Sequence, residues 1–240
     1  MPHKNPTVSA IIAARGGSVR LPRKALLPWD GTTLIGNKVR QLLACPLVTQ
    51  IAVNTDDIEI AEAALEAVKC RGGCGVTLID GRDYAGDTRE MIRDSARQVE
   101  GDVILWAHPT NPLVDTPHYT RALAEFLDDD GGTYDSLCSV TAVRRHAWYE
   151  ERPLNHYPWG ERHQLAAELT PVYFQNGAIF IQRREAMLEN GCFYGESPRL
   201  FELDAEVGVD IDTDADYRRA QQISDFVRAA MGDSTKGQVP

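Results

Sequence analysis

The chain has 240 residues, 43% of them hydrophobic and 25% charged, which is ordinary for one globular α/β domain with or without a small appendage. It carries 35 Asp and Glu against 25 Lys and Arg, and this net charge of -10 argues against broad binding to nucleic acid or anionic membranes. No apolar stretch approaches the roughly 18 residues of a membrane helix, and the N-terminus lacks a signal-peptide pattern. The odd number of cysteines, five, favours reduced thiols and a cytoplasmic location over a disulfide framework.

Apolar runs rich in β-branched residues alternate with amphipathic stretches through the first 140 residues. The runs predict strands over 8–13, 50–53, 75–79, 102–107 and 136–142. The stretches between them predict helices near 34–44, 58–68, 87–99 and 117–127. This alternation predicts an α/β fold with a doubly wound, mostly parallel sheet. Ligands of such sheets bind beyond the carboxyl ends of the strands.

The pattern changes after Val143. Residues 144–165 are rich in His, Trp, Tyr, Arg and Pro without clean periodicity, and they predict an insertion or a hairpin arm. Parallel-sheet character is expected to return over 176–181. The last helix is expected near Thr213, where Thr213 and Asp216 are spaced as a capping box, and the polar tail from Gly232 is expected to fray.

The first predicted strand runs into a glycine turn that carries four cations in ten residues, while no acidic residue precedes Asp30. Glycines let backbone N–H groups converge on one point, and nearby cations suit a polyphosphate. The turn matches neither standard phosphate-loop motif, so a structural turn is the alternative. The residues concerned are Arg15, Gly16, Gly17, Ser18, Arg20, Arg23 and Lys24.

Two carboxylates stand two residues apart in Val209-Asp210-Ile211-Asp212-Thr213. In a short strand, alternation places Asp210 and Asp212 on one side and Ile211 toward the core. Carboxylates at this spacing suit Mg²⁺, which takes one or two of them together with substrate phosphates. The alternative is a solvated acidic strand end that only starts the last helix.

A proline-flanked loop, His108-Pro-Thr-Asn-Pro-Leu113, follows the strand that ends at Ala107. The two prolines fix the backbone, so that Thr110 and Asn111 present hydrogen-bonding groups at the same edge of the sheet. The alternative is a rigid strand-to-helix connector.

Together these motifs resemble the sialic-acid (acylneuraminate) cytidylyltransferases, in order and approximate spacing over roughly residues 8–225. The matching segments are Arg15-Gly-Gly-Ser18 with Arg20-Leu-Pro-Arg-Lys24, Asn54-Thr-Asp-Asp57, His108–Leu113, Asn176-Gly-Ala-Ile-Phe-Ile181 and Asp210-Ile-Asp-Thr213. Shorter matches are Pro153-Leu-Asn155, Pro171-Val-Tyr173 and Gly191-Cys-Phe-Tyr194.

The resemblance implies transfer of CMP from CTP to a hydroxyl of an acidic sugar, with Mg²⁺ and release of pyrophosphate. It implies catalytic roles for Arg15, Lys24 and Asp212, and metal binding by Asp210 and Asp212. The nucleotide-binding positions are Ala13, Ala14, Arg15, Gly16, Gly17, Ser18, Arg20, Lys24, Asp87 and Thr110. The acceptor-binding positions are His108, Asn111, Arg144, Arg145, Gln164, Asn176, Phe193 and Tyr194.

The resemblance also implies a Rossmann-like nucleotidyltransferase domain over residues 1–240. Within it, residues 144–170 would form a small arm that dimerises and reaches into the partner's site. We therefore expect a homodimer that binds CTP and a small acidic acceptor.

Several positions depart from the family's pattern. Val19 replaces a Lys, and Ala25 replaces an Asn that helps to hold the nucleotide, which weakens the inference of cytosine. His108 and Asn111 replace a Gln and a Ser, and an Arg-Pro pair is missing, with Arg82 as an uncertain substitute. The extra charge of Arg144 and Arg145 suggests an acceptor other than ordinary sialic acid, either a related nine-carbon sugar acid or a small phosphonate. The alternative is that both arginines are exposed arm residues.

Other interpretations stay open. The donor base could differ, as in an enzyme that uses UTP, or the chain could be a non-catalytic nucleotide-binding regulator or a dimeric scaffold. The pair Cys70 and Cys74 lacks the second pair that a structural zinc site normally needs, and a turn is the plainer interpretation. The spacing of His146, His156 and His163 matches no standard ligand pattern, and they are better interpreted as solvent or interface residues.

Overall fold

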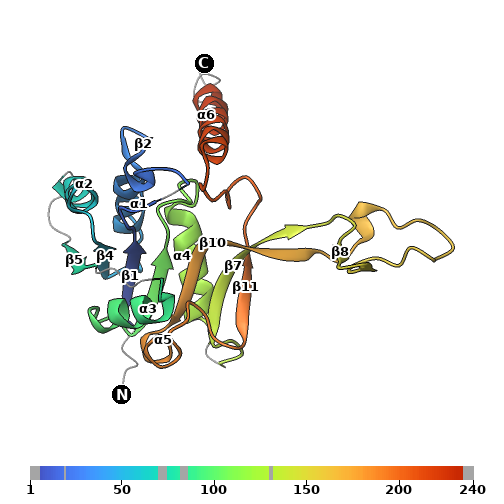
Figure 1. Ribbon diagram of the computed structural model, residues 1–240, viewed down its shortest axis with the longest axis horizontal. Coiled ribbons are helices and arrows are strands. Elements are labelled where there is room, and N and C mark those ends of the chain that lie inside the picture. Colours follow the sequence, from blue (N-terminus) through green and yellow to red (C-terminus); the bar gives the residue numbers. More distant parts are fainter. Residues whose placement is uncertain (1–5, 19, 70–74, 82–85, 130–131, 235–240) are drawn as a thin grey trace, which may run out of the picture.

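The computed structural model describes residues 6–18, 20–69, 75–81, 86–129 and 132–234. A seven-stranded sheet in the order β11-β7-β10-β6-β1-β4-β5 forms its centre (Figure 1). All strands run parallel except β10, which is antiparallel to both of its neighbours. The strands are β1 (Val8–Ala13), β4 (Gln50–Thr55), β5 (Val76–Asp80), β6 (Val103–Ala107), β7 (Ser136–Val143), β10 (Val172–Arg183) and β11 (Pro198–Glu202).

Helices cover both faces of the sheet, because successive side chains of a buried strand point to opposite faces. On one face Ala10 and Ile12 of β1 pack in a core with α1 (Leu34–Leu43), α2 (Ile58–Lys69) and α4 (Thr116–Leu127). On the other face Ile11 packs in a second core with α3 (Thr88–Arg97) and α5 (Arg184–Asn190). The doubly wound α/β fold predicted from the sequence is therefore confirmed.

The predicted strands and helices of the first 143 residues all form, with ends within two residues of the expected ones. The expectation of parallel pairing over 176–181 is wrong, since β10 returns antiparallel after the chain has left the sheet at the end of β7. Apolar alternation encodes which face of a strand is buried but not its direction. The sequence analysis also missed α5 and β11.

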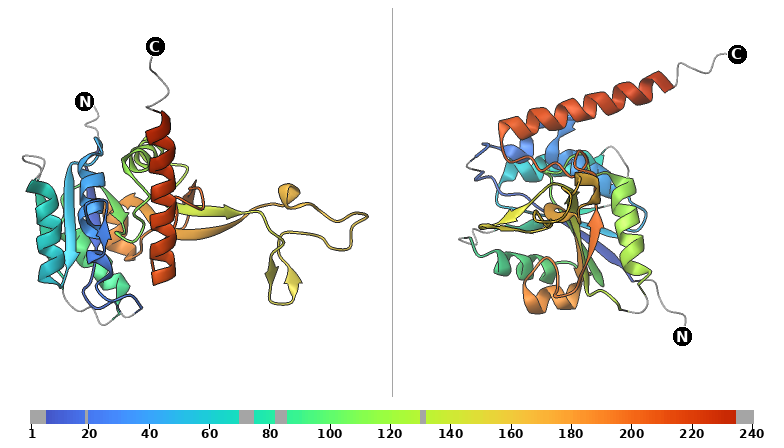
Figure 2. Two further views of the ribbon diagram at one scale, coloured as in Figure 1. Left: turned by 90° about the horizontal axis from the view of Figure 1, so that it is seen from above. Right: turned by 90° about the vertical axis from the view of Figure 1, so that its right-hand side faces the viewer.

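The segment between β7 and β10 leaves the body of the molecule as a protruding arm (Figures 1 and 2). β7 and β10 stay paired up to Val143 and Val172. Beyond that point the arm holds the short hairpin β8 (Trp148–Tyr149) and β9 (Arg152–Pro153), then the 3-10 turn η2 (Ala166–Glu168). It presents large apolar side chains to solvent, of which Trp159 is 71% exposed.

The C-terminal helix α6 (Asp214–Ser234) runs past the body of the molecule (Figure 2). Its predicted capping box is present, because the Thr213 backbone N–H donates to Asp216 and the Asp216 N–H donates back to the Thr213 hydroxyl. The helix packs on the small hairpin of β2 (Pro28–Trp29) and β3 (Thr32–Thr33). In the described ranges no helix is long and apolar enough to cross a bilayer.

Candidate active site

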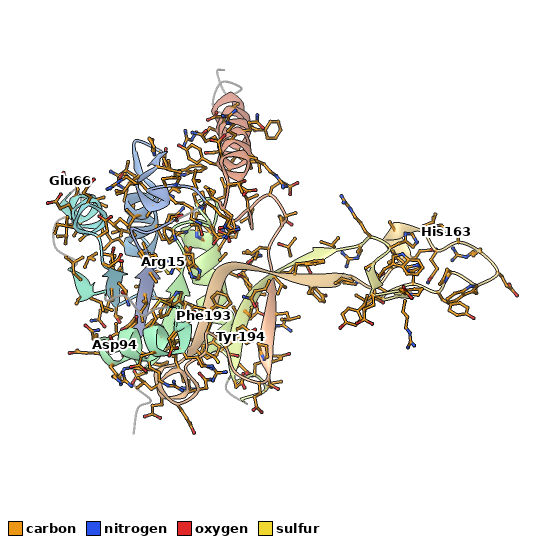
Figure 3. All side chains as sticks on the ribbon, in the orientation of Figure 1. Arg15, Glu66, Asp94, His163, Phe193 and Tyr194 are labelled. Carbon is orange, nitrogen blue, oxygen red and sulfur yellow. The ribbon has the colours of Figure 1, made fainter. Side chains whose placement is uncertain are left out.

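Two adjoining cavities open at the carboxyl ends of β1, β4 and β6, the edge where ligands of parallel sheets bind. The β4 cavity, of about 380 Å³, extends toward Asn54, Asp56 and Asp87. The β10 cavity, of about 420 Å³, extends toward Lys24 and Asp210. The two share a wall, which consists of Ala13, Ala14, Arg15, His108 and Phe193. Figure 3 labels Arg15 and Phe193 in this region.

The glycine turn after β1 is fastened to the end of β4. The Gly16 N–H donates to the Asp56 carboxylate over 2.9 Å, and the Ala14 N–H donates to the Asn54 carbonyl over 2.9 Å. A β-carbon on Gly16 would collide with the Asp57 side chain. Glycine at this position therefore permits the close approach of the turn to β4, while the exposed Arg15 lines both cavities.

Asp212 joins the two cations that follow the glycine turn. Its carboxylate lies 2.9 Å from Lys24 Nζ and 2.9 Å from an Arg20 guanidinium nitrogen. Lys24 lies on the 3-10 turn η1 (Lys24–Leu26), which brings it beside the segment that precedes α6. Two of the predicted phosphate cations thus pair with one predicted metal ligand, and the group keeps one positive charge.

Asp210 lines the β10 cavity on the same segment, but residues 209–213 form no strand, so the expected strand is wrong here. The segment is held instead by the Ile211 N–H, which donates to the Thr110 carbonyl, while the Ile211 side chain is buried. Burial raises the pKa of Asp210, and the nearby Asp212 charge adds to this shift. Such a carboxylate is stabilised by an added cation.

The carboxylate pair fits a magnesium ion that takes its other ligands from phosphate and water. Within the described ranges, no group of three or more His, Cys, Asp or Glu side chains is arranged to hold a metal ion.

His108 stands in the shared wall as a neutral imidazole. Its Nδ1 lies 2.6 Å from the Gly177 carbonyl, and because a carbonyl only accepts, Nδ1 carries the proton. Burial lowers the pKa of the ring. Phe180 and Phe193 pack edge-on against it, with centroids 6.1 and 5.9 Å away. Nε2 is thus the nitrogen that remains able to accept a hydrogen bond.

Asn111 and Asn176 connect the site loops from the interior. The buried Asn111 amide donates to the Asn176 and Val209 carbonyls. The Asn176 amide oxygen accepts from Ser139 Oγ over 2.6 Å. Neither asparagine lines the β10 cavity. These contacts lie at a bulge in β10 between Gln175 and Phe180, which turns the Gly177 carbonyl toward His108.

The remaining predicted site residues divide between the cavities and more distant places. Asp87 caps α3 and lines the β4 cavity, while Ser18, Arg20 and Thr110 line the β10 cavity. The exposed Gly17 and the half-buried Gly16 line neither cavity. Tyr194 faces a separate hollow beside α5. Arg144, Arg145 and Gln164 lie on the arm, where the Gln164 carbonyl accepts from His146.

Some expectations fall outside the described residues, and some site residues were missed. Val19, Arg82, Cys70 and Cys74 lie outside the described ranges. The sequence analysis assigned no role to Asp56, although it holds the glycine turn. The motif Asn54-Thr-Asp-Asp57, which directly follows a strand, was the available signal. Gln175 also lines the β10 cavity, and nothing in its local sequence marks it.

Comparison with known families assigns the chain to a family. The family model described as cytidylyltransferase matches residues 9–224 of this chain. The chain belongs to the cytidylyltransferase family. The match contains the glycine turn, the proline-flanked loop and both aspartates, which are the elements that build the two cavities.

Named relatives of this cytidylyltransferase include two enzymes of acidic sugars. The N-acylneuraminate cytidylyltransferase A of Danio rerio is 32% identical over 91% of this chain, which spans only 51% of that protein. A pseudaminic acid cytidylyltransferase of Campylobacter jejuni is 27% identical over 88% of this chain and 93% of its own length. A CMP:2-keto-3-deoxy-manno-octonic acid synthetase complexed with CTP shares the fold, with a TM-score of 0.66 at 22% identity, covering 91% of this chain and 99% of that one.

Proposed function

We propose that this cytidylyltransferase transfers CMP from CTP to a hydroxyl of a sialic-acid-like sugar acid and releases pyrophosphate, with Mg²⁺. The observation that supports it most is the pair of adjoining cavities with one common wall. Two substrates that react with each other need neighbouring sites, and a hydrolase of a single substrate does not. Relatives named for acylneuraminic and pseudaminic acids support an acidic sugar as the acceptor.

On the donor side, the β4 cavity would take the cytidine, and the triphosphate would pass Arg15 toward Arg20 and Lys24. Charge develops on the leaving pyrophosphate as the bond to the α-phosphorus breaks, so fixed cations beside it lower the barrier. Arg20 and Lys24 would exchange their Asp212 contacts for phosphate oxygens. Asp210 and Asp212 would hold the metal, which when bound supplies positive charge at the reacting phosphates.

On the acceptor side, the β10 cavity would hold the sugar acid against His108 and Phe193. The acceptor hydroxyl attacks the α-phosphorus and forms the new P–O bond as pyrophosphate departs. Asp212 lines neither cavity but pairs with Arg20 and Lys24, which line this one, and it would help to activate the hydroxyl or bind only the metal. His108 lies in the common wall, where its Nε2 would accept a hydrogen bond from a hydroxyl of the sugar acid.

We also propose a cytoplasmic homodimer that assembles through the arm. The exposed aromatic side chains of the arm support this, because contiguous apolar surface marks interaction sites. Arg144, Arg145 and Gln164 stand on the same arm and line neither cavity, so we propose that they would reach an acceptor in the partner's cavity.

The experiment is a pyrophosphate-release assay with CTP, UTP, ATP or GTP and Mg²⁺ against four acceptors: N-acetylneuraminic acid, pseudaminic acid, 3-deoxy-manno-octulosonic acid and a small phosphonate. We expect turnover with CTP and a sugar acid, and loss of at least 100-fold in kcat for Asp210→Asn in a folded protein. Turnover with UTP alone would contradict CTP as the donor, and turnover with the phosphonate alone would contradict a sugar acid as the acceptor. Binding of CTP without turnover of any acceptor would favour a regulatory protein.

A further inference from the structure

A lysine is completely buried beneath the loop that carries His108 and Thr110. Lys38 lies on α1 and is 0% exposed, and it lines neither of the two cavities. Its Nζ lies 2.9 Å from the Asn111 carbonyl and 3.0 Å from the Val114 carbonyl. Its third contact is the Tyr119 hydroxyl of α4, 2.6 Å away. An amine this deeply buried is costly unless each polar group finds a partner.

The contacts favour an uncharged amine. A carbonyl oxygen only accepts, so Nζ must donate to Asn111 and to Val114. As an ammonium, Lys38 would also donate to Tyr119, and in the described part of the chain the phenolic proton would then have no acceptor. As an amine, Nζ can instead accept a hydrogen bond from the phenolic O–H, so that Nζ, the hydroxyl and both loop carbonyls each have a partner. Burial lowers the pKa of Lys38 to about 7, against a smaller opposing effect of Asp115, which agrees with this assignment.

The loop held by Lys38 supports the reacting side of the site. The Thr110 carbonyl accepts from the Ile211 N–H and so carries the segment of Asp210 and Asp212. The Asn111 side chain extends the connection to Val209. The side chains of two neighbours of Lys38 on α1, Asn37 and Gln41, donate to the Pro112 carbonyl, which lies between the two carbonyls that Lys38 holds.

We propose that Lys38 is a positioning residue of the transferase site, whose amine and Tyr119 partner hold the Asn111 and Val114 carbonyls and thereby fix His108, Thr110 and the aspartate segment. This proposal rests on the proposed function for its kinetic readout but not for its structural one. The glycine turn with Arg15 is fastened to the end of β4 instead, so this part of the donor side does not depend on Lys38.

The experiment compares Lys38→Met and Tyr119→Phe with Leu42→Ala in the full-length protein. Leu42 is fully buried one turn along α1, and its apolar side chain cannot hold the loop carbonyls, so this control reports the loss of buried packing without the loss of those hydrogen bonds. Hydrogen exchange of the amides over 110–115 and melting temperature are measured for each variant. So are the CTP-induced rise in melting temperature and the kcat and KM values with the acceptor identified above.

We expect exchange of the loop to rise at least 10-fold in Lys38→Met and at least threefold in Tyr119→Phe, and not in Leu42→Ala at a similar loss of melting temperature. We expect kcat to fall at least 10-fold in Lys38→Met while the KM for CTP stays within threefold. Loop exchange equal to that of Leu42→Ala would overturn the proposal, and Tyr119→Phe provides the same test if Lys38→Met does not fold. Absence of any CTP effect in the unmodified protein would refute the proposed function and leave the exchange result valid.

Discussion

At the scale of single residues, Asp212 pairs with Arg20 and Lys24. A residue expected to bind the metal is therefore bonded to two residues expected to bind phosphate. A triphosphate alone must displace a carboxylate, and a cation alone must displace two basic side chains. Bound together, phosphate and metal replace the broken pairs with new ones, so their binding is coupled.

The coupling can be measured by titration calorimetry with Mg²⁺ and CTP, separately and together. We expect Mg²⁺ to tighten CTP binding by a factor of about 5 to 150, the range typical of such coupling. Asp212→Asn frees the two cations, so it should tighten CTP binding without Mg²⁺ and abolish most of the gain from Mg²⁺. Asp214→Asn, a charge-matched and exposed control, should change neither. Additive binding in the unmodified protein would contradict the exchange of partners.

The burial of Lys38 predicts that the free energy of unfolding depends on pH. Burial depresses its pKa to about 7 in the folded protein, below its ordinary value of 10.5. Between these values the unfolded chain binds more protons, so stability rises with pH, by about 1.4 kcal/mol per pH unit at most. The free energy of unfolding of the unmodified protein, minus that of Lys38→Met, should increase from pH 7.5 to 9.5 in urea titrations. A difference that does not change with pH would mean that Lys38 keeps its charge in the fold.

At the scale of elements, the bulge in β10 positions His108 beside the cavity that we propose for the acceptor. Ser139 of β7 is buried beneath it, where its hydroxyl donates to Asn176 and accepts the Ile179 N–H. These bonds satisfy the backbone that the bulge withdraws from the β7 ladder. The displaced Gly177 carbonyl then fixes the His108 ring.

Removal of the Ser139 hydroxyl should weaken the binding of the acceptor more than the binding of CTP. Ser139→Ala leaves a buried N–H without its partner, which costs about 1–3 kcal/mol of stability. We expect the KM for the acceptor to rise at least fivefold and the KM for CTP to stay within twofold. Ser9→Ala is the matched control, because Ser9 is an equally buried strand serine that bonds Gln50 and Gly101 at the opposite edge. Equal kinetic effects of both variants would argue against a local role of the bulge.

The arm contains three histidines whose rings touch. His146 stacks on His163 with centroids 4.7 Å apart and meets His156 at 4.9 Å. The pKa of His156 is lowered, by burial first and then by its two neighbours. Since a base with a lowered folded pKa binds fewer protons when folded, this part of the arm loses stability as the pH falls below about 6.5.

Fluorescence of Trp148, whose ring lies 5.4 Å from His156, reports the titration. The difference between the emission of the unmodified protein and that of Trp148→Phe should change between pH 7 and 5. The transition should vanish in His156→Gln and persist in His118→Gln, since His118 lies on α4. An unaltered transition in His156→Gln would show that the arm does not respond through this cluster.

At the scale of the whole molecule, two projections leave the body: the arm and the distal part of α6 (Figure 2). Both expose large apolar side chains, such as Trp159 and Phe226, at 71% and 75%. The proposed dimer uses the arm. Trp159→Ser should convert dimer to monomer in sedimentation velocity, while Phe226→Ser should leave the dimer intact. A monomeric unmodified protein, or dissociation by Phe226→Ser alone, would contradict assembly through the arm.

The sequence predicted the layers of the fold well because the spacing of apolar residues indicates which faces of strands and helices are buried. It could not predict the direction of β10, which depends on how the chain returns from the arm. The asparagines of the site loops show a similar limit. Asn111 is a polar residue in a ligand-edge loop, yet its amide bonds Val209, 98 residues away, and is buried in the interior. Lys38 likewise lies on the apolar face of α1, four residues from the buried Leu34 and Leu42, but lysine is a residue type that is rarely buried.

The wall of Arg15, His108 and Phe193 has one further consequence. A side chain that faces two compartments cannot be altered for one of them alone. A smaller side chain in place of Phe193 would enlarge the β10 cavity, proposed for the acceptor, and would also reshape the β4 cavity, proposed for the donor. New acceptor preferences should therefore arise first at positions such as Gln175 that line one cavity, while changes in the common wall should alter the binding of both substrates.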